Sequence, residues 1–284
     1  MNVARTKAEL RAALVPARRD GRSIGLVPTM GALHGGHLSL LRAARERCDL
    51  VVMSLFVNPS QFGPREDLAS YPRDEARDLA VAEAEGVDLV YAPAVEAVYP
   101  DGFATSVEVG GDLASVLDGD RTRRGPEHFR GVATVVAKLF NSVGPEVAFF
   151  GQKDAQQALV IRRMVRDLDF PLEVVVLPTV REQDGLAMSS RNAYLDGDER
   201  RRATALHRAL RAAESAASPT GPTEPALAAA RVELERAGIE PEYLEARDAE
   251  TLAPAESFNR RRVLVAVAAR VGRARLIDNA VIGG

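Results

Sequence analysis

Short apolar runs alternate with helical patterns through the first two thirds of the chain. The runs are SIGLVP, DLVVMSLFV, VDLVYAP, EVAFF and LEVVVLP, and the stretches between them carry apolar residues at helical spacing. A strand that is apolar at every position must be buried on both faces, as in a parallel sheet covered by helices on both sides. The alternation therefore predicts an α/β fold with a Rossmann-like, doubly wound parallel sheet.

The pattern changes after Thr179. An Arg- and Ala-rich helical stretch over residues 198–217 is followed by the Pro-rich link SPTGPTEP and a second helical stretch, ALAAARVELERAG. Three strand-like runs then follow, EYLEARD, RVLVAVAARV and RARLIDNAVI. We expect a nucleotide-binding domain over residues 1–179 and a smaller α+β carboxyl-terminal domain over residues 180–284, which acts as a lid.

Composition excludes several classes of protein. No apolar run among the 284 residues approaches the roughly 18 to 20 needed to span a bilayer, so we expect no membrane association. Residues 1–19 form a basic amphipathic helical pattern without the apolar segment of a secretory signal, so we expect a cytoplasmic protein. The net charge is −3 and the arginines are scattered, which argues against a nucleic-acid partner.

The single cysteine, Cys48, rules out an internal disulfide framework and a cysteine-based zinc cluster. Cys48 lies inside the helical pattern LLRAARERCDL, and a buried cysteine usually behaves as a small hydrophobe. We therefore expect it to be a core thiol and not a nucleophile.

The first apolar run ends in the turn PTMGALHGGH, which contains two of the four histidines. Gly31, Gly35 and Gly36 allow a ligand to approach the backbone, and a helix that starts near Gly36 points its N–H groups and positive dipole end at that ligand. The turn has neither the G-x-G-x-x-G pattern nor a Walker G-K-[ST] ending. Phosphate is the expected ligand. His34 and His37 can donate hydrogen bonds to a leaving pyrophosphate. Either histidine alone would be better explained as a helix cap or a core residue, but two of them on a glycine-lined turn favour the phosphate role.

The segment FFGQKDAQQ, Phe149 to Gln157, places polar residues after another predicted strand. Lys153 can contact phosphate, and Gln157 lies one helical turn from Lys153 on the same face. Asp154 can hold Mg²⁺ or simply cap the helix.

Two further segments carry groups for binding. In FVNPSQF a strand ends at Asn58-Pro59 and leaves Gln61 at the carboxyl edge of the sheet, where both ends of its amide can bond a small polar substrate. The segment GLAMSSRN, Gly185 to Asn192, joins the two predicted domains and offers hydroxyls and an arginine to an anion. We predict a mobile clamp there, and the alternative is a Ser- and Asn-rich linker.

Taken together, these segments resemble the pantothenate synthetase family, the ATP-dependent pantoate–β-alanine ligases. PTMGALHGGH, LFVNPSQF, YPRD, HFRGVATVVAKLFN, FGQKDAQQ and PTVREQDGLAMSSRN occur in the order that the family has, and they cover most of residues 27–195. The histidine turn also resembles the HxGH signature of nucleotidylyltransferases. MSSR is similar to the KMSKS signature of class I aminoacyl-tRNA synthetases.

The resemblance implies roles for particular residues. His37 would be the proton donor, with His34 and Lys153 beside it on the phosphates. Gln61 would contact both pantoate and β-alanine, and Gln157 would be a second pantoate contact. Val180 would lie against adenine through its backbone. The implied ATP-binding set is Met30, Gly31, Ala32, Leu33, His34, Gly35, Gly36, His37, Gly151, Gln152, Lys153, Asp154, Val180, Met188, Ser189, Ser190 and Arg191.

The chain departs from the family pattern at two places. Gly35 stands where the family usually has glutamate, which should change the stiffness of the loop more than its chemistry. The short run RPGHF is expanded here to RTRRGPEHF, so no role is transferred to Arg123, Arg124 or His128.

The implied reaction is the condensation of (R)-pantoate with β-alanine through a pantoyl adenylate, with release of AMP and pyrophosphate. ATP is a substrate, Mg²⁺ is the expected cofactor, and a homodimer is what the family suggests. The sequence does not identify the base that deprotonates β-alanine.

Three other functions compete with this one. A nucleotidylyltransferase that keeps AMP or CMP on its product would need a cationic acceptor site in place of two glutamines. A tRNA-charging enzyme would need an anticodon-sized second domain and a basic face. A nucleotide sensor without catalysis would not need paired histidines or a clamp.

Overall fold

The computed structural model describes residues 1–64 and 66–283, in which the chain divides into two compact units. Unit 1 comprises Met1–Gly151 and Gln157–Leu177, and unit 2 comprises Gln152–Gln156 and Pro178–Gly284. The main division thus falls at Leu177–Pro178. The short segment around Lys153 groups with unit 2.

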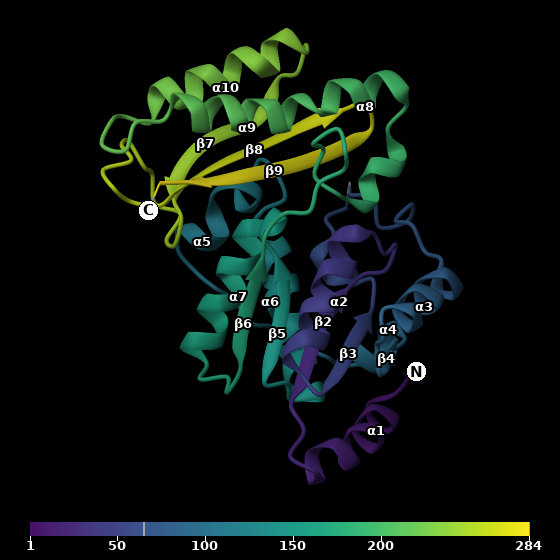
Figure 1. Cartoon of the computed structure of the whole chain (residues 1–284). Coiled ribbons are helices and arrows are strands. Elements are labelled where there is room, and N and C mark those ends of the chain that lie inside the picture. Colours follow the sequence, from purple (N-terminus) through teal and green to yellow (C-terminus); the bar gives the residue numbers. More distant parts are fainter. Residues whose placement is uncertain (65, 284) are drawn as a thin grey trace. The chain divides into compact units, whose positions relative to one another are not determined.

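Unit 1 is built on a parallel sheet of six strands in the order β1-β4-β3-β2-β5-β6 (Figure 1). The strands of this sheet are β1 (Asn2–Ala4), β2 (Ile24–Thr29), β3 (Leu50–Leu55), β4 (Leu89–Tyr91), β5 (Val147–Gly151) and β6 (Glu173–Leu177). The doubly wound α/β fold is confirmed.

Helices cover both faces of this sheet, which is why its strands need apolar residues at consecutive positions. Leu26 and Val52 face a core shared with α1, α6 and α7, whereas Val27 and Val51 face a second core with α2 and α3. The helices of unit 1 are α1 (Lys7–Arg19), α2 (Gly35–Arg47), α3 (Glu75–Ala84), α4 (Val95–Val98), α5 (Asp112–Ser115), α6 (Pro126–Val143) and α7 (Ala155–Asp167), the last of which begins in unit 2.

The strand order places a switch point between β2 and β5. From β2 the chain proceeds through β3 to β4 on one side, and from β5 it proceeds to β6 on the other. Ligands of doubly wound sheets bind beyond the carboxyl ends of the strands at such a point. The histidine turn follows β2 and Gly151 ends β5, so both lie at this end of the sheet.

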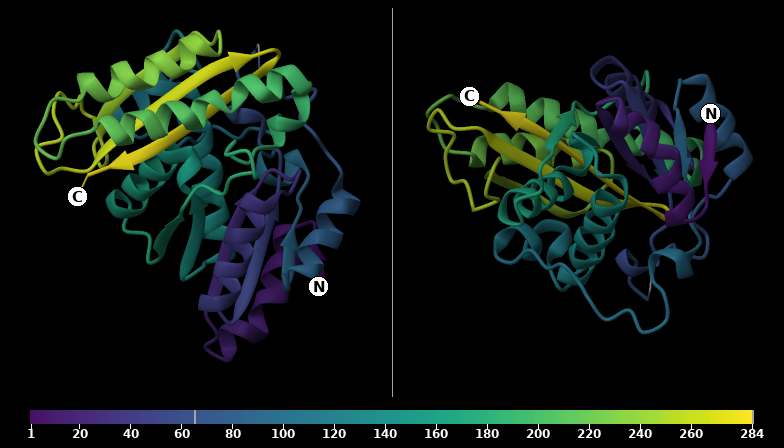
Figure 2. Two further views of the ribbon diagram at one scale, coloured as in Figure 1. Left: turned by 45° about the horizontal axis from the view of Figure 1, so that its top comes forward. Right: turned by 90° about the horizontal axis from the view of Figure 1, so that it is seen from below.

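Unit 2 contains an antiparallel sheet of three strands, β7 (Pro241–Asp248), β8 (Val263–Val271) and β9 (Ala274–Ile282), in the order β7-β8-β9. Helices α9 (Ala205–Ala216) and α10 (Glu224–Arg236) pack against this sheet and against each other (Figure 2). The unit also contains α8 (Gly197–Ala203). Its core is distinct and includes Leu206, Leu234 and Val265.

Two local predictions are corrected. Residues 2–4 form strand β1 on the edge of the sheet before α1 begins, although the helical pattern had indicated no strand there. The helix predicted over residues 198–217 is interrupted at Thr204. The Thr204 hydroxyl donates to the Arg201 carbonyl at 2.8 Å, a local bond that competes with regular helix hydrogen bonding.

Cys48 is buried in the core that α2 and α3 share with the sheet, as expected for a core thiol. Burial raises the pKa of its thiol, which disfavours the reactive thiolate. Across residues 1–64 and 66–283, none of the helices combines the length and the apolar character that crossing a membrane requires.

Candidate active site

The histidine turn has a backbone that few sequences can adopt. Gly31 has a φ of +82° and Ala32 a φ of +51°, both in the left-handed region. A β-carbon at Gly31 would lie 2.7 Å from Asp78 Oδ2 and 2.9 Å from Leu55 Cδ1, so glycine is required there by space as well as by φ. The turn reverses the chain sharply between β2 and α2.

A buried carboxylate holds this turn. Asp78, on α3, accepts the backbone N–H of Ala32 and that of Leu33, each at 2.8 Å, and is 1% exposed. Sequence reasoning missed Asp78 because the backbone that it contacts lies 45 residues earlier. One signal was available, since Asp78 is an acidic residue four positions from the buried Ala82 on the same helix.

His34 and His37 lie together at the start of α2. His34 is the N-cap, and its Nδ1 accepts the Gly36 N–H at 3.1 Å. His37 Nδ1 accepts the His34 N–H at 3.4 Å, and the two ring centroids are 4.1 Å apart. Because each Nδ1 is an acceptor, the hydrogen of each neutral ring is on Nε2. Capping therefore uses one nitrogen of each imidazole and makes the other a donor.

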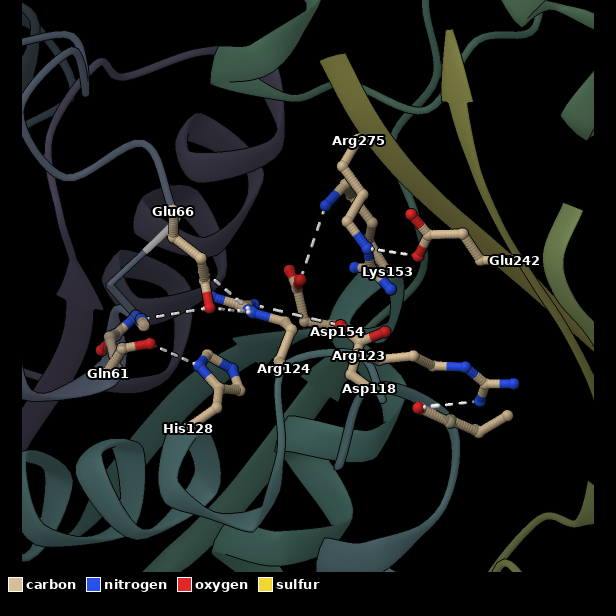
Figure 3. A network of polar contacts seen from close by, with 12 residues as sticks. Gln61, Glu66, Asp118, Arg123, Arg124, His128, Lys153, Asp154, Glu242 and Arg275 are labelled. Atoms are coloured by element: carbon tan, nitrogen blue, oxygen red, sulfur yellow. Dashed lines mark hydrogen bonds and ion pairs between the residues drawn. The ribbon is translucent and has the colours of Figure 1, made fainter. Parts of the chain in front are cut away.

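Gln61 is buried and its side-chain amide is oriented by contacts at both ends. Its Oε1 accepts from Asn58 Nδ2 at 3.1 Å, and its Nε2 lies 3.2 Å from the sulfur of Met30. Its backbone carbonyl oxygen lies 2.7 Å from His128 Nδ1. Figure 3 shows the two residues facing each other. The structure thus brings Gln61 into contact with the first residue of the predicted ATP-binding turn.

Asn58 supports Gln61 through a small hydrogen-bond network that the sequence analysis did not identify. Its Oδ1 accepts from the hydroxyl groups of Tyr99, at 2.8 Å, and Ser60, at 2.9 Å, and its Nδ2 also donates to the Gly131 carbonyl. Burial raises the pKa of Tyr99, so its phenol stays protonated and donates. A β-carbon at Gly131 would lie 2.3 Å from the Ser60 carbonyl oxygen, so only glycine allows α6 to approach this closely.

The RTRRGPEHF segment makes contacts within unit 1. Arg124 pairs with Glu66, at 2.6 Å between Nη2 and Oε2, and Arg123 donates to the Leu117 carbonyl at 2.9 Å (Figure 3). These two contacts and the His128 contact with Gln61 are structural, and no substrate role is assigned to them.

In unit 2, Lys153 and Asp154 lie on the 3₁₀ turn η3 (Gln152–Asp154) that follows β5. Lys153 Nζ is 3.5 Å from Asp154 Oδ1, and the Lys153 side chain is 19% exposed while that of Asp154 is 47% exposed (Figure 3). Asp154 therefore remains accessible to a cation. Gln157 lies in the first turn of α7 and is half-buried.

The predicted clamp segment begins in the second arm of a β-hairpin. The Met188 N–H donates to the Val180 carbonyl at 3.0 Å, and the Glu182 N–H donates to the Leu186 carbonyl at 2.8 Å. Gly185, with a φ of +89°, forms the turn between the arms. Ser189 then caps the 3₁₀ turn η4 (Ser190–Tyr194). The segment is thus a hairpin arm that continues into a 3₁₀ turn.

Among the described residues, no group of three or more His, Cys, Asp or Glu side chains is arranged to hold a metal ion. Mg²⁺ is commonly held by one or two carboxylates together with substrate phosphates. A single accessible carboxylate at Asp154 fits that kind of site and does not fit a metal cage made of protein ligands alone.

Comparisons with known proteins agree on one family. The family described as "Pantoate-beta-alanine ligase" matches residues 2–281. The chain is 54% identical to the pantothenate synthetase of Moorella thermoacetica, with 99% of each chain covered. It is similar to the crystal structure of pantothenate synthetase from Thermus thermophilus, with 50% identity, a TM-score of 0.91 and 99% of each chain covered.

A third relative was solved with ligands. The pantoate-β-alanine ligase of Francisella tularensis, complexed with "Beta-gamma ATP" and β-alanine, is 31% identical with a TM-score of 0.81. The match covers 99% of this chain and 97% of the other.

Proposed function

The chain belongs to the pantoate–β-alanine ligase family, and we propose that its histidine turn, glutamines and clamp carry out the two half-reactions of that ligation. The chain is an enzyme that joins pantoate to β-alanine at the expense of ATP. A carboxylate and an ammonium ion form a salt and not an amide at neutral pH. The carboxylate must therefore be activated first, and ATP supplies the activation.

In the first half-reaction, a pantoate carboxylate oxygen attacks the α-phosphorus of ATP in line. A new P–O bond forms, the bond to the β-phosphate bridge breaks, and pyrophosphate leaves from a pantoyl adenylate. No enzyme nucleophile is required. Catalysis consists of positioning the reactants and stabilising the charge that develops on the phosphate oxygens.

One observation carries this proposal, which is the hydrogen-bonding state of the paired histidines. Both Nδ1 atoms accept backbone N–H groups, so both Nε2 atoms carry hydrogens at the amino end of α2. A helix amino terminus favours anions, and two imidazole donors there suit the oxygens of a leaving pyrophosphate. We assign His37 Nε2–H as the hydrogen-bond donor to the leaving pyrophosphate and His34 Nε2–H as its neighbour on the phosphates.

Lys153 and the clamp supply the remaining charge. Lys153 is the cation of the η3 turn, and Ser189, Ser190 and Arg191 follow directly after the hairpin arm. A planar guanidinium and adjacent hydroxyls match phosphate oxygens. Mg²⁺ held by Asp154 would neutralise further phosphate charge when it is bound.

Gln61 and Gln157 orient pantoate in this scheme. The contacts of the Gln61 amide with Asn58 and Met30 fix which end presents oxygen and which presents nitrogen. Neither glutamine is charged, so neither one should bind the triphosphate strongly. Replacing either with alanine should raise the pantoate KM or lower kcat while the ATP Kd changes little. An equal loss of ATP binding would show that the residue does not belong to the pantoate site.

In the second half-reaction, the amine of β-alanine attacks the acyl carbon of the adenylate. A C–N bond forms, the bond between the acyl carbon and the phosphate oxygen breaks, and AMP leaves. The amine must arrive without its ammonium proton and loses one further proton as the amide forms. The base that accepts it is not assigned.

A pyrophosphate-release experiment tests the whole scheme. With ATP and pantoate but no β-alanine, the enzyme should release about one pyrophosphate per site in a single burst. AMP should follow only when β-alanine is added. Pyrophosphate release without pantoate, or a product that retains the AMP moiety, would favour a nucleotidylyltransferase instead.

Two properties of the intact enzyme are also proposed on the basis of family membership. We expect it to work in the cytoplasm and to form a homodimer. Light scattering of the purified chain tests the second point, since a single species of monomer mass would contradict it.

A further inference from the structure

Strand β9 carries two adjacent buried polar residues, Asp278 and Asn279, in an otherwise largely apolar sequence. They are 3% and 6% exposed. Successive side chains of a strand point to opposite faces of the sheet, so the two side chains serve different partners. Burying a polar group is costly unless it is hydrogen-bonded, so their partners indicate why they are there.

Asn279 holds the backbone of the turn that carries Lys153. Its Nδ2 donates to the carbonyl oxygens of Gln152, at 3.0 Å, and Lys153, at 2.9 Å. Its Oδ1 accepts from Gln152 Nε2 at 3.0 Å. Both donor hydrogens of the amide and its oxygen are therefore committed to one short segment, which they fix in position and orientation.

Asp278 holds the hairpin that leads into the clamp. Its Oδ2 lies 2.6 Å from Arg181 Nη1, and its Oδ1 lies 3.1 Å from Arg181 Nη2. Arg181 also donates to the Gly185 carbonyl at 3.2 Å, which ties the turn of the hairpin to the same guanidinium. Such two-pronged pairing fixes direction as well as distance.

The two anchors are linked to each other. They are consecutive residues, and the Asn279 backbone N–H donates to Asp278 Oδ1 at 2.8 Å. A displacement of β9 at this point would move both the η3 turn and the hairpin. Their common support lies within unit 2, so it does not depend on the placement of unit 1.

We infer that Asp278 and Asn279 form a positioning pair that sets Lys153 and the Met188–Arg191 clamp at a fixed spacing for the triphosphate. The inference rests on the proposed roles of Lys153 and the clamp. Neither member of the pair touches the nucleotide in this account. Changes in the pair should therefore alter ATP affinity and the rate of adenylate formation. They should not alter the KM for β-alanine.

The first test replaces Asn279 with aspartate, which has nearly the same size but no Nδ2 donor, and with alanine. Two hydrogen bonds to the η3 backbone are lost in each variant. At roughly 1 kcal/mol each, their loss should reduce kcat/KM for ATP on the order of tenfold or more. The KM for β-alanine, measured at saturating ATP, should stay within about twofold of wild type.

The matched control is Thr223→Val. Thr223 is also buried in unit 2, and its hydroxyl donates to the Ala255 carbonyl at 2.7 Å, away from both anchored segments. This variant should lower the melting temperature while the ATP parameters stay at their wild-type values. If Asn279→Asp changed only the melting temperature, as the control should, the positioning role would be refuted.

A double variant tests the route of the effect. Because Asn279 acts through the η3 turn, Asn279→Ala should add little to the ATP defect of Lys153→Ala. Full additivity of the two defects would overturn the inference. Arg181→Lys tests the other anchor, since it keeps the charge but loses the two-pronged geometry with Asp278.

The outcomes separate the inference from the function on which it rests. Lys153→Ala and Arg191→Ala with wild-type pyrophosphate release would overturn the proposed roles of those residues, and the inference with them. Impaired Lys153→Ala and Arg191→Ala beside normal Asn279→Asp and Arg181→Lys would overturn the inference alone. If an Asn279 variant does not fold, Arg181→Lys decides instead, since it weakens the pairing with Asp278 and should weaken ATP binding, and wild-type ATP parameters in that variant would overturn the inference.

Discussion

The histidine turn of unit 1 and the clamp hairpin of unit 2, each of which we propose to contact the nucleotide, are stabilised differently. The turn depends on left-handed backbone at Gly31 and Ala32 and on one buried carboxylate, Asp78. The hairpin uses ordinary antiparallel hydrogen bonds and an ion pair between Arg181 and Asp278. A strained turn has few alternative conformations, and the hairpin is anchored by Asp278, whereas Ser189–Arg191 lie beyond the hairpin arm. We expect the turn to be fixed and these clamp residues to respond to ligand.

The largest expected effect tests the fixed turn. His37→Ala should leave the fold intact and slow adenylate formation by about 10² to 10⁴, the range for loss of a positioned acid or donor. Single-turnover pyrophosphate release measures this step. Ser39→Ala is the control, since Ser39 lies on the same helix turn and donates to the Gly36 carbonyl at 2.8 Å. Near wild-type release by His37→Ala would remove this residue from the mechanism.

Asp78→Ala tests what holds the turn. It leaves the N–H groups of Ala32 and Leu33 without their acceptor, which should lower the free energy of unfolding by about 2 to 4 kcal/mol. Adenylate formation should also slow, because the histidines lose their support. Glu75→Ala on the same helix is the control. Glu75 forms an exposed ion pair with Arg5, and its loss should cost less than about 1 kcal/mol.

Urea denaturation with a pyrophosphate assay on the same samples checks this prediction. A variant at Asp78 that is as stable and as active as Glu75→Ala would show that the backbone of the turn does not depend on the carboxylate.

The third prediction tests the clamp segment. Amide exchange across residues 185–192 should be fast without nucleotide and slower with ATP, because phosphate contacts offset the entropy of fixing the segment. Arg191→Ala should reduce that protection and weaken transition-state binding by about 1.5 to 3 kcal/mol. Arg201→Ala, at an exposed position in α8, should do neither. Equal exchange with and without ATP would contradict the comparison of a fixed turn with a clamp that responds to ligand.

The smallest effect concerns His207 behind the hairpin. Its pKa lies below the ordinary value of 6.5 because of burial and then the charge of Arg181, and the nearby Arg211 lowers it further, while Asp278 and Glu214 act in the opposite direction. The unfolded chain therefore binds this proton more readily than the folded one. The free energy of unfolding should not be reduced by protonation of His207 above about pH 6.5, and it should decrease as the pH falls below that value.

The check compares urea midpoints of wild type and His207→Gln from pH 8 down to pH 5. The wild type should lose more stability than the variant over the acidic part of that range. Parallel pH profiles would show that protonation of His207 is not coupled to folding.

The sequence predicted what depends on local patterns. The parallel sheet follows from its apolar runs, and the turn, the clamp and the glutamines follow from motifs whose members are neighbours in the chain. Strand β1 was missed because three residues are too few to show a period. Asp78 and Asn279 were missed for another reason. Their partners are backbone groups 45 and 127 residues away, and a backbone group has no signature in the sequence.

Because β9 carries the anchors of both segments of unit 2 that we propose to contact the nucleotide, the order of protein synthesis matters for this enzyme. A ribosome makes Gln152, Lys153 and the hairpin long before it reaches Asp278 and Asn279. Until then those segments have no partner on β9 to hold them. We therefore expect a nascent or truncated chain that lacks β9 to retain the histidine turn but to bind ATP poorly, so that competence for the nucleotide is acquired only near the end of translation.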